Sequence, residues 1–519
     1  MDKKRCATTE ASTVPGKRTR DDATETEALR IAPIRMFKTA ASNNDSMKPR
    51  NKIHDVHVKE LCTTLRQVLG FDGNQPDASI EWLVISNYLI DPQYLLEEVP
   101  ELLSIGCVVV FYGYEDNPLT GWKQAVGDSI DFRCLRPSDP PGPTNPTGYS
   151  TPYGVHHTKM FLIGFSNKTI RVVVHTANLR YSDIHLKSQG LYLQDFPLKS
   201  GESKKGPTSA FENTLLDYLD TYRYTEPRVW GQGEDPDFLR GVIRRYDYSS
   251  ASVVLLPCTP GLHHIDAKEL RGHLKVRQAI AQYTKPYAST DSGRPIVCQF
   301  SSMGSVSEKY LRELQSSMDT RLARQPLSTT KDLSTIHMKL VYPTVKEIRE
   351  SIEGYYGGGT VPGRSKNVSK AFLRPLFHKW SSNPNHNATK NPLWRGNHVP
   401  HIKSYFQLSK DNRSMEYFIL GSQNLSMAAW GNLQNHTRSG TRRLFMRHWE
   451  LGVFLSPSTL GCDKLVPWYP DVVDLVHDTA MIPLPYCEIP EVYSATDSPW
   501  AVDAQYSEPD AFGRHSVQG

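Results

Sequence analysis

Residues His156–Gly190, HHTKMFLIGFSNKTIRVVVHTANLRYSDIHLKSQG, contain a pattern that returns in reduced form far downstream. His157 and Lys159 form a His-x-Lys unit, and Asn178 follows 19 residues after the lysine in the string HTANL. Gln189 comes 11 residues after Asn178.

The second copy lies between Pro400 and Leu455. His401 and Lys403 form its His-x-Lys unit, Asn424 follows 21 residues after the lysine in SQNL, and Glu450 comes later in HWELGVFL. The two units lie 244 residues apart. This repeat predicts two similar halves in one chain.

One unit assembles groups suited to phosphoryl chemistry. In a strand, His and Lys two positions apart point to the same face. An imidazole can attack phosphorus or move protons near neutral pH, and ammonium and amide groups hold phosphoryl oxygens. Gln189 and Glu450 can each hold one ring nitrogen of a histidine and thereby fix its orientation. Two facing units predict a nucleophile and an acid on opposite sides of one phosphorus, with either histidine in either role.

The flanking strings resemble a known family. HHTKMFLIG, HTANL, SQG, PHIKSY, NLSMAAWG and WELG together are similar to tyrosyl-DNA phosphodiesterase, a branch of the phospholipase D superfamily, over roughly residues 52–495. A lone buried histidine is more often an ordinary core residue, but the matched pair with its flanking strings is specific. The resemblance implies an α/β fold with two similar phospholipase D-like α-β-α sandwich domains related by a pseudo-twofold axis.

Two expected aspartates are missing. Lipid-cleaving members of the superfamily carry HxKxxxxD, whereas Gly164 and Leu408 stand five residues after the two lysines. This departure is typical of the tyrosyl-DNA branch. In that branch, residues at the positions of Gln189 and Glu450 orient the histidines instead.

The resemblance implies hydrolysis of the 3′-phosphotyrosyl bond between DNA and a tyrosine or peptide derived from topoisomerase I, and of other 3′ adducts. His157 would be the nucleophile that forms a phosphohistidine, and His401 the general acid and base, with a 3′-phosphate as product. No metal and no cofactor is expected. The groups that would stabilise the charged transition state are Lys159, Lys403, Asn178 and Asn424.

Two alternatives stay open from the sequence. A phospholipase or a general nuclease of the same superfamily would use the same motifs, although the aspartates are missing. A non-catalytic nucleic-acid scaffold is the alternative from another class, although both units are intact. Assays on lipid, on phosphotyrosyl DNA and in single turnover separate the three.

The resemblance also implies substrate contacts. Tyr88 and Tyr153 stand where the family places aromatic residues near the tyrosine end of the substrate, although half-buried packing is an equal interpretation. The turn in VCQFSSMGS (297–305) offers Ser301, Ser302 and Gly304 to DNA phosphates. The full set of expected substrate-binding residues is Lys159, Lys403, Tyr88, Tyr153, Ser302, Ser422 and Lys366. Leu262 stands where the family tends to carry arginine after Pro-Gly, so that contact is not transferred.

Two further segments are candidates for nucleic-acid binding. The segment 355–370, YYGGGTVPGRSKNVSK, lacks the spacing of a phosphate-binding Walker loop and is predicted to be a mobile basic rim. Its phosphate contacts would be Arg364, Lys366 and Lys370. The segment 271–277 is predicted to be helical, with a solvated basic face.

Composition indicates a globular protein without a membrane span. Of 519 residues, 38% are hydrophobic and 22% are charged, and no apolar run approaches the ~18 residues of a spanning helix. The N-terminus lacks the apolar core of a signal peptide. The eight cysteines are scattered and are expected to be reduced thiols of an intracellular protein.

Charge placement helps to divide the chain into domains. Residues 1–52 hold 12 Lys/Arg against 7 Asp/Glu and are predicted to be a disordered basic tail. Its basic clusters at 3–5 and 17–20 resemble a bipartite nuclear import signal, although a merely solubilising tail has the same composition. The remaining predicted units are a first domain at 53–248, a second at 249–495 and a disordered acidic tail at 496–519. A monomer in the nucleus with DNA as its partner is expected.

The expected elements follow hydrophobic periodicity. Apolar spacing predicts a helix over 58–69, strands over 80–90 and 107–112, and helices over 215–222 and 236–246. The run SVVLL at 252–256 is predicted to open the second domain.

Overall fold

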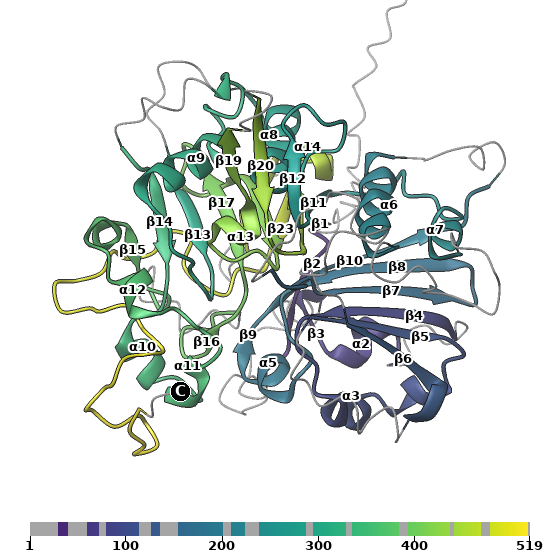
Figure 1. The fold of residues 1–519 in the computed structure, drawn as a ribbon, viewed down its shortest axis with the longest axis horizontal. Coiled ribbons are helices and arrows are strands. Elements are labelled where there is room, and N and C mark those ends of the chain that lie inside the picture. The colour runs from purple at the N-terminus through teal and green to yellow at the C-terminus, as the bar shows by residue number, and fades with distance from the viewer. Residues whose placement is uncertain are drawn as a thin grey trace, which may run out of the picture.

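The computed structural model describes residues 30–39, 60–71, 79–113, 126–134, 154–200, 209–223, 238–286, 294–327, 335–382, 393–435, 441–468 and 478–516. Two sheets dominate this part of the chain. In Figure 1 the first sheet, coloured purple to blue, lies beside the second, coloured teal to yellow-green.

The first sheet has eight strands. Their order is β3 (Cys62–Thr63), β2 (Ile34–Phe37), β10 (Gly190–Pro197), β8 (Thr169–His175), β7 (Met160–Phe165), β4 (Ile80–Asn87), β5 (Val108–Tyr112) and β6 (Ile130–Cys134). From β10 to β4 neighbouring strands are antiparallel, and from β4 to β6 they are parallel. The predicted strands at 80–90 and 107–112 are confirmed as β4 and β5.

The second sheet repeats this arrangement. Its order is β11 (Val254–Cys258), β21 (Glu450–Leu455), β18 (Met415–Gly421), β17 (Ser404–Leu408), β13 (Ile296–Gln299), β14 (Met338–Val341) and β15 (Phe377–His378). From β21 to β13 the pairs are antiparallel, and from β13 to β15 they are parallel, as in the first sheet from β10 to β6. The predicted pair of similar halves is therefore present, strand by strand.

Helices cover both sheets. The first half contains α2 (Leu65–Leu69), α3 (Pro92–Glu98), α5 (Tyr181–His185), α6 (Ala210–Arg223) and α7 (Phe238–Ile243). The second contains α8 (Gly272–Tyr283), α9 (Glu308–Met318), α10 (Val345–Arg349), α11 (Tyr355–Gly358), α12 (Ser365–Val368), α13 (Met427–Trp430) and α14 (Pro457–Leu460). The helices predicted over 215–222 and 236–246 are confirmed as α6 and α7. Among the described residues no helix is long and apolar enough to cross a bilayer.

Strand periodicity builds the layers. In β4, Val84 faces the core that includes α6, whereas Leu83 and Ile85 face the core that includes α2 and α3. Alternate residues of a strand point to opposite faces, so a continuous apolar strand fills two cores. The second sheet does the same, since Phe418 and Tyr417 belong to different clusters. The resulting arrangement is an α-β-α sandwich in each half.

The two halves share one core. The cluster that holds Val84 and Val174 of the first sheet also holds Phe418 and Leu451 of the second. A two-stranded parallel pair of β9 (Lys187–Ser188) and β16 (Val399–Pro400) also joins the halves, directly beside both Gln189 and His401. The junction therefore positions residues from both repeats in one place.

The expectation of a disordered tail over 1–52 is wrong for residues 30–39. β1 (Arg30–Ile31) pairs with β23 (Thr479–Ile482), and β2 pairs with both β10 and β3. Met36 and Phe37 are fully buried. These strands pair with partners distant in sequence, which local patterning does not reveal. The basic clusters at 3–5 and 17–20 lie outside the described residues.

The helix predicted over 58–69 is wrong in its middle. Cys62–Thr63 forms β3 against β2, and the helix that follows is only α2. Thr64 ends the strand and caps α2 in a reciprocal pair of hydrogen bonds with Gln67. The unpredicted β2 is the reason that this strand was missed.

The predicted acidic tail at 496–519 is also ordered through residue 516. Trp500 is buried, donates from its indole nitrogen to Gly358 O at 3.1 Å, and stacks with Tyr355 and Tyr506. Aromatic packing onto α11 outweighs the polar composition of this segment. The expectation that segment 355–370 is a mobile rim is therefore wrong, because Trp500 and Tyr506 of the C-terminal segment pack against it.

The basic face predicted over 271–277 is mostly buried. Lys275 is 7% exposed and lies 3.5 Å from Glu269, and His273 is fully buried and bonds Ser317 at 2.8 Å. Arg277 donates to Ser316 O. These side chains are used in contacts within the fold and do not form a free basic surface.

Three small sheets complete the described part of the chain. β12 (Gly261–His264), β20 (Arg442–Met446) and β19 (Asn432–Asn435) form one, and β1, β23 and β22 (Lys464–Pro467) form another. The third is the β9–β16 pair at the junction.

Candidate active site

The repeat positions both His-x-Lys units at equivalent strands. His157 and Lys159 lie immediately before β7, and His401 and Lys403 immediately before β17. We expected His and Lys to lie within the strands. Both units instead form extended segments that lead into the strands. Asn178 follows β8, the partner of β7, and Asn424 follows β18, the partner of β17. Equivalent positions in facing halves bring the two sets together.

Glu450, the first residue of β21, holds the ring of His157. His157 Nδ1 donates to Glu450 Oε2 at 2.8 Å, and the carboxylate is 1% exposed. Burial lowers the pKa of His157 to about 4, against the opposing effect of Glu450. Burial raises the pKa of Glu450, but His157 and then His448 outweigh it and hold that pKa well below its usual range. At neutral pH the ring is neutral, and its Nε2 lone pair is free to attack.

Gln189 holds the ring of His401. Its Nε2 donates to His401 Nδ1 at 2.9 Å, and the amide is fixed by Thr176, which donates to Oε1 at 2.7 Å. The two predicted hydrogen bonds to the histidines are therefore present, and each crosses from one half to the other. Burial and the charge of Lys403 lower the pKa of His401 well below its usual value.

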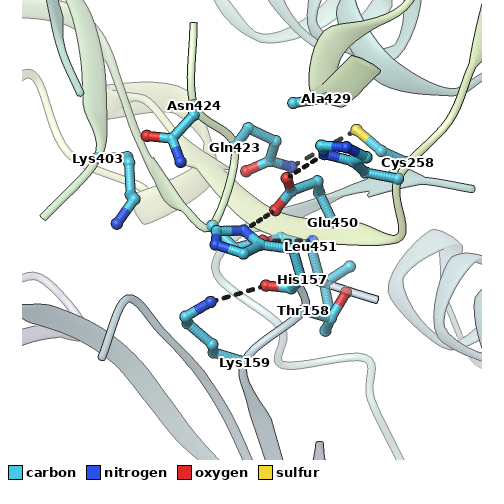
Figure 2. Close-up of polar contacts among 12 residues, drawn as sticks. His157, Thr158, Lys159, Cys258, Lys403, Gln423, Asn424, Ala429, Glu450 and Leu451 are labelled. Carbon is cyan, nitrogen blue, oxygen red and sulfur yellow. Dashed lines mark hydrogen bonds and ion pairs between the residues drawn. The ribbon is translucent and has the colours of Figure 1, made fainter. Parts of the chain in front are cut away.

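Both lysines are buried beside the histidines. Lys159 Nζ donates to His157 O at 3.0 Å, and Lys403 Nζ donates to His401 O at 2.5 Å. Burial lowers the pKa of Lys159 to about 8. Burial and the positive charge of Lys159 lower the pKa of Lys403 well below its usual value. In Figure 2 both ammonium groups and the Asn424 amide point into the same region beside the His157 ring. An anion in this region would gain from both charges.

The two asparagines are fixed differently. Asn424 Oδ1 accepts from the backbone nitrogens of Ser301 and Ser302 at 3.2 and 3.0 Å. Its NH₂ is therefore turned toward the site and can donate. Asn178 Nδ2 donates to Asp183 Oδ1 at 3.1 Å, which leaves one further N–H on that amide.

Aromatic and hydroxyl groups support the first unit. The Tyr88 ring centre lies 5.2 Å from that of His157 and 5.7 Å from Lys159 Nζ, so this predicted residue borders the first His-x-Lys unit. His156 Nε2 is 2.8 Å from Tyr222 Oη, which anchors the segment from behind. Tyr153 lies outside the described residues.

The predicted phosphate-binding serines are placed differently from expectation. Ser301 and Ser302 use their backbone nitrogens on Asn424, so their contribution is to orient that amide. Ser422 is fully buried, and its hydroxyl exchanges hydrogen bonds with the backbone of Leu451. The hydroxyl of Ser422 therefore joins β18 to β21, and its contact with substrate stays a prediction.

The basic residues of 355–370 divide into two kinds. Arg364 and Lys366 are exposed at α12. Lys370 donates to Ser305 Oγ at 3.1 Å and to Val306 O at 2.6 Å, so it fixes the segment to the neighbouring turn. Leu262 is a half-buried residue of β12.

The sequence did not single out two groups at the site. Asp183 is fully buried, and its Oδ1 lies 3.5 Å from His401 Nδ1. His448 Nδ1 lies 3.4 Å from Glu450 Oε1, so one carboxylate serves two imidazoles. The available signals were the position of Asp183 five residues after Asn178 and that of His448 two before Glu450.

Taken together, the site pairs the neutral imidazole of His157 with a second imidazole, two lysines and two amides. The model of the tyrosyl-DNA phosphodiesterase family matches residues 47–494. The chain belongs to this family. It is 31% identical over 467 residues to tyrosyl-DNA phosphodiesterase 1 of Arabidopsis thaliana, covering 83% of this chain and 71% of that protein. It is 27% identical to the Drosophila melanogaster protein of the same name, covering 91% and 74%.

The fold agrees with this assignment. The crystal structure of yeast tyrosyl-DNA phosphodiesterase superposes with a TM-score of 0.63 at 15% identity, covering 91% of this chain and 99% of that one. The architecture is thus the two-domain phospholipase D-like fold of the family, as the sequence predicted.

Proposed function

We propose that the protein hydrolyses the phosphodiester bond between a DNA 3′ end and a tyrosine, such as a peptide remnant of topoisomerase I. Family membership supports the substrate class. The observation that carries the proposal is the pair of His–Lys–Asn sets, each with its histidine held at Nδ1 by a residue of the other half. Two oriented imidazoles around one cationic region suit a two-step displacement at phosphorus.

In the first step His157 Nε2 attacks phosphorus. The P–O bond to tyrosine breaks, its electron pair stays on the phenolic oxygen, and that oxygen takes a proton from His401 Nε2. The product is a phosphohistidine whose positive ring donates from Nδ1 to Glu450. The carboxylate therefore stabilises charge that develops during attack.

In the second step His401, left neutral with its remaining proton on Nδ1 after Nε2 has given up its own, takes a proton from water at Nε2. The resulting oxygen nucleophile attacks phosphorus, and the P–N bond breaks with its electron pair returning to His157 Nε2. DNA leaves with a 3′-phosphate, and His401 is again protonated. Lys159, Lys403 and the Asn424 amide balance the phosphoryl charge in both steps.

Substrate orientation follows from what borders the site. Tyr88 lies against His157 and suits the face of an aromatic leaving group. The exposed Arg364 and Lys366 suit the backbone of the DNA strand. The missing aspartates after both lysines favour this substrate over a lipid. We further propose that the protein works as a monomer in the nucleus, consistent with the basic clusters near its N-terminus.

The test is cleavage of an oligonucleotide carrying a 3′-phosphotyrosine in the presence of EDTA. The expected product is free tyrosine and a 3′-phosphate, identified by mass, because lysines supply the positive charge at the reacting group. The matched control is the same oligonucleotide with a 5′-phosphotyrosine. No release from the 3′ substrate, or release only with a divalent metal, would contradict the proposal.

A further inference from the structure

Asp183 is a buried carboxylate without an assigned task. It lies in α5, is fully buried, and its Oδ2 has no hydrogen-bond partner among the described residues. Its Oδ1 accepts from Asn178 Nδ2 at 3.1 Å and lies 3.5 Å from His401 Nδ1. Burying a carboxylate whose second oxygen makes no hydrogen bond costs free energy of desolvation, so the contact with Asn178 alone does not explain why a carboxylate lies here.

The surroundings of His401 explain why a carboxylate matters there. Burial lowers the pKa of the ring, and four neighbours lower that pKa further, namely Lys403, Lys159, Lys187 and His157. Gln189, which holds Nδ1, is neutral. Glu450 is bonded to His157 and His448, and Glu353 pairs with Lys187 at 2.8 Å. None of these carboxylates is therefore paired with His401, and the carboxylate that lies beside its ring is Asp183.

Protonation changes what Nδ1 requires. In the neutral ring that carries its proton on Nε2, Nδ1 accepts from Gln189 Nε2. In the imidazolium, and in the neutral ring left after Nε2 gives up its proton, Nδ1 carries a proton and needs an acceptor, and Gln189 Oε1 at 3.3 Å and Asp183 Oδ1 at 3.5 Å are within reach. Only the carboxylate also offers a negative charge.

The two halves differ at this position. Asp183 is five residues after Asn178, and the residue five after Asn424 is Ala429, on the equivalent short helix α13. Each half nevertheless supplies one carboxylate to the site, Asp183 from the first and Glu450 from the second. The two histidines therefore have different partners at Nδ1. His157 contacts the carboxylate of Glu450, whereas His401 lies between the neutral amide of Gln189 and the carboxylate of Asp183.

We propose that Asp183 is the counter-charge of protonated His401, a positioning residue that makes His401 the acid of the first step and the base of the second. This inference rests on the proposed function. In the first step Asp183 holds the imidazolium until its Nε2 proton passes to the leaving oxygen. In the second it stabilises the imidazolium that forms when His401 takes a proton from water.

The test varies the leaving group. Asp183→Asn removes the charge and keeps an oxygen that can accept from Asn178. First-step rates are measured in single turnover on a 3′-phosphotyrosyl oligonucleotide and on its 4-nitrophenyl counterpart, whose more acidic leaving group needs little protonation. We expect the tyrosyl rate to fall at least about tenfold more than the nitrophenyl rate, within the ~10²–10⁴-fold that a general acid contributes. The ratio within one preparation does not depend on the fraction of folded protein.

Controls separate this inference from the proposed function. Asp195→Asn removes a carboxylate that pairs with Arg171 in the same half, and it should leave the ratio unchanged. In a His401→Ala background, Asp183→Asn should have no further effect on the ratio. Equal loss on both substrates, or no loss on either, would overturn the role of Asp183. If His401→Ala showed no dependence on the leaving group, or the wild-type protein failed to release tyrosine, the proposed function itself would fail.

Discussion

Replacing Glu450 with glutamine should slow the first chemical step without removing any group that touches the substrate. The amide introduced by Glu450→Gln keeps an oxygen that can accept from His157 Nδ1 and fills the same buried space. The change removes the negative charge 2.8 Å from the ring. His157 must become positive as it bonds to phosphorus, so the transition state loses stabilisation that the resting site does not need.

The size of this effect follows from the bond. A hydrogen bond to a charged group contributes about 1.5–3 kcal/mol and the neutral bond that glutamine keeps about 0.5–1.5 kcal/mol, so the transition state loses about 1–1.5 kcal/mol. Since about 1.36 kcal/mol is a tenfold change in rate, the first-step rate in single turnover should fall by about 5- to 13-fold. The binding constant for DNA should change little, because Glu450 is buried behind the histidine.

The assay measures tyrosine release under single turnover at saturating enzyme. The matched control is Glu313→Gln, since Glu313 lies 3.3 Å from His273 in a histidine–carboxylate pair outside the site. Its first-step rate should equal that of the wild type. An unchanged rate in Glu450→Gln, or an equal loss in both variants, would refute the assignment of Glu450 to the nucleophile.

Three further predictions concern pH, the N-terminus and DNA binding. On a 4-nitrophenyl substrate, kcat/KM should fall below pH about 4, where His157 becomes protonated, and above pH about 8, where Lys159 loses its charge. A midpoint of the acidic limb near the ordinary histidine pKa of 6.5 would contradict the argument that burial lowers the pKa of His157. Deleting residues 1–28 should leave Tm unchanged, whereas deleting 1–39 should lower it sharply, because it removes buried side chains worth ~1.5–3 kcal/mol each; equal Tm values would show that the strands are dispensable. Neutralising Arg364 and Lys366 together should reduce the slope of log K against log salt for single-stranded DNA by about 1.4, and an unchanged slope would move DNA binding elsewhere.

The sequence predicts the parts of the fold that are repeated. His-x-Lys and Asn recur at the ends of equivalent strands, so one pattern reveals both β7–β8 and β17–β18. The pairing of Gln189 and Glu450 with the histidines also follows from the motifs, because each histidine needs a partner for its second nitrogen. That each partner comes from the other half is shown only by the structure.

Unrepeated segments are missed because their partners are distant in sequence. β2 is four residues long between polar stretches, and its partner β10 lies more than 150 residues away. Missing β2 also hides β3, which has no other neighbour in the sheet. Trp500 likewise appears isolated in an acidic tail until α11 is seen beside it.

At the site, burial is the information that sequence lacks. Asp183 is one of many acidic residues in the chain, and its significance depends on full burial at 3.5 Å from His401. Ser422 shows the converse, since its hydroxyl is used by the backbone of Leu451. Both outcomes depend on packing between halves rather than on local pattern.

The most direct measurement is intact-protein mass after His401→Ala is mixed with a 3′-phosphotyrosyl oligonucleotide. Tyrosine is a fairly good leaving group, with a phenol pKa of ~10, so attack by His157 can proceed without its acid. The second step lacks its base, and a DNA adduct on His157 should accumulate and be released by acid, as a phosphoramidate is. His157→Ala should form no adduct. An adduct on His401 in the His157→Ala protein, with none on His157 in the His401→Ala protein, would reverse the two roles.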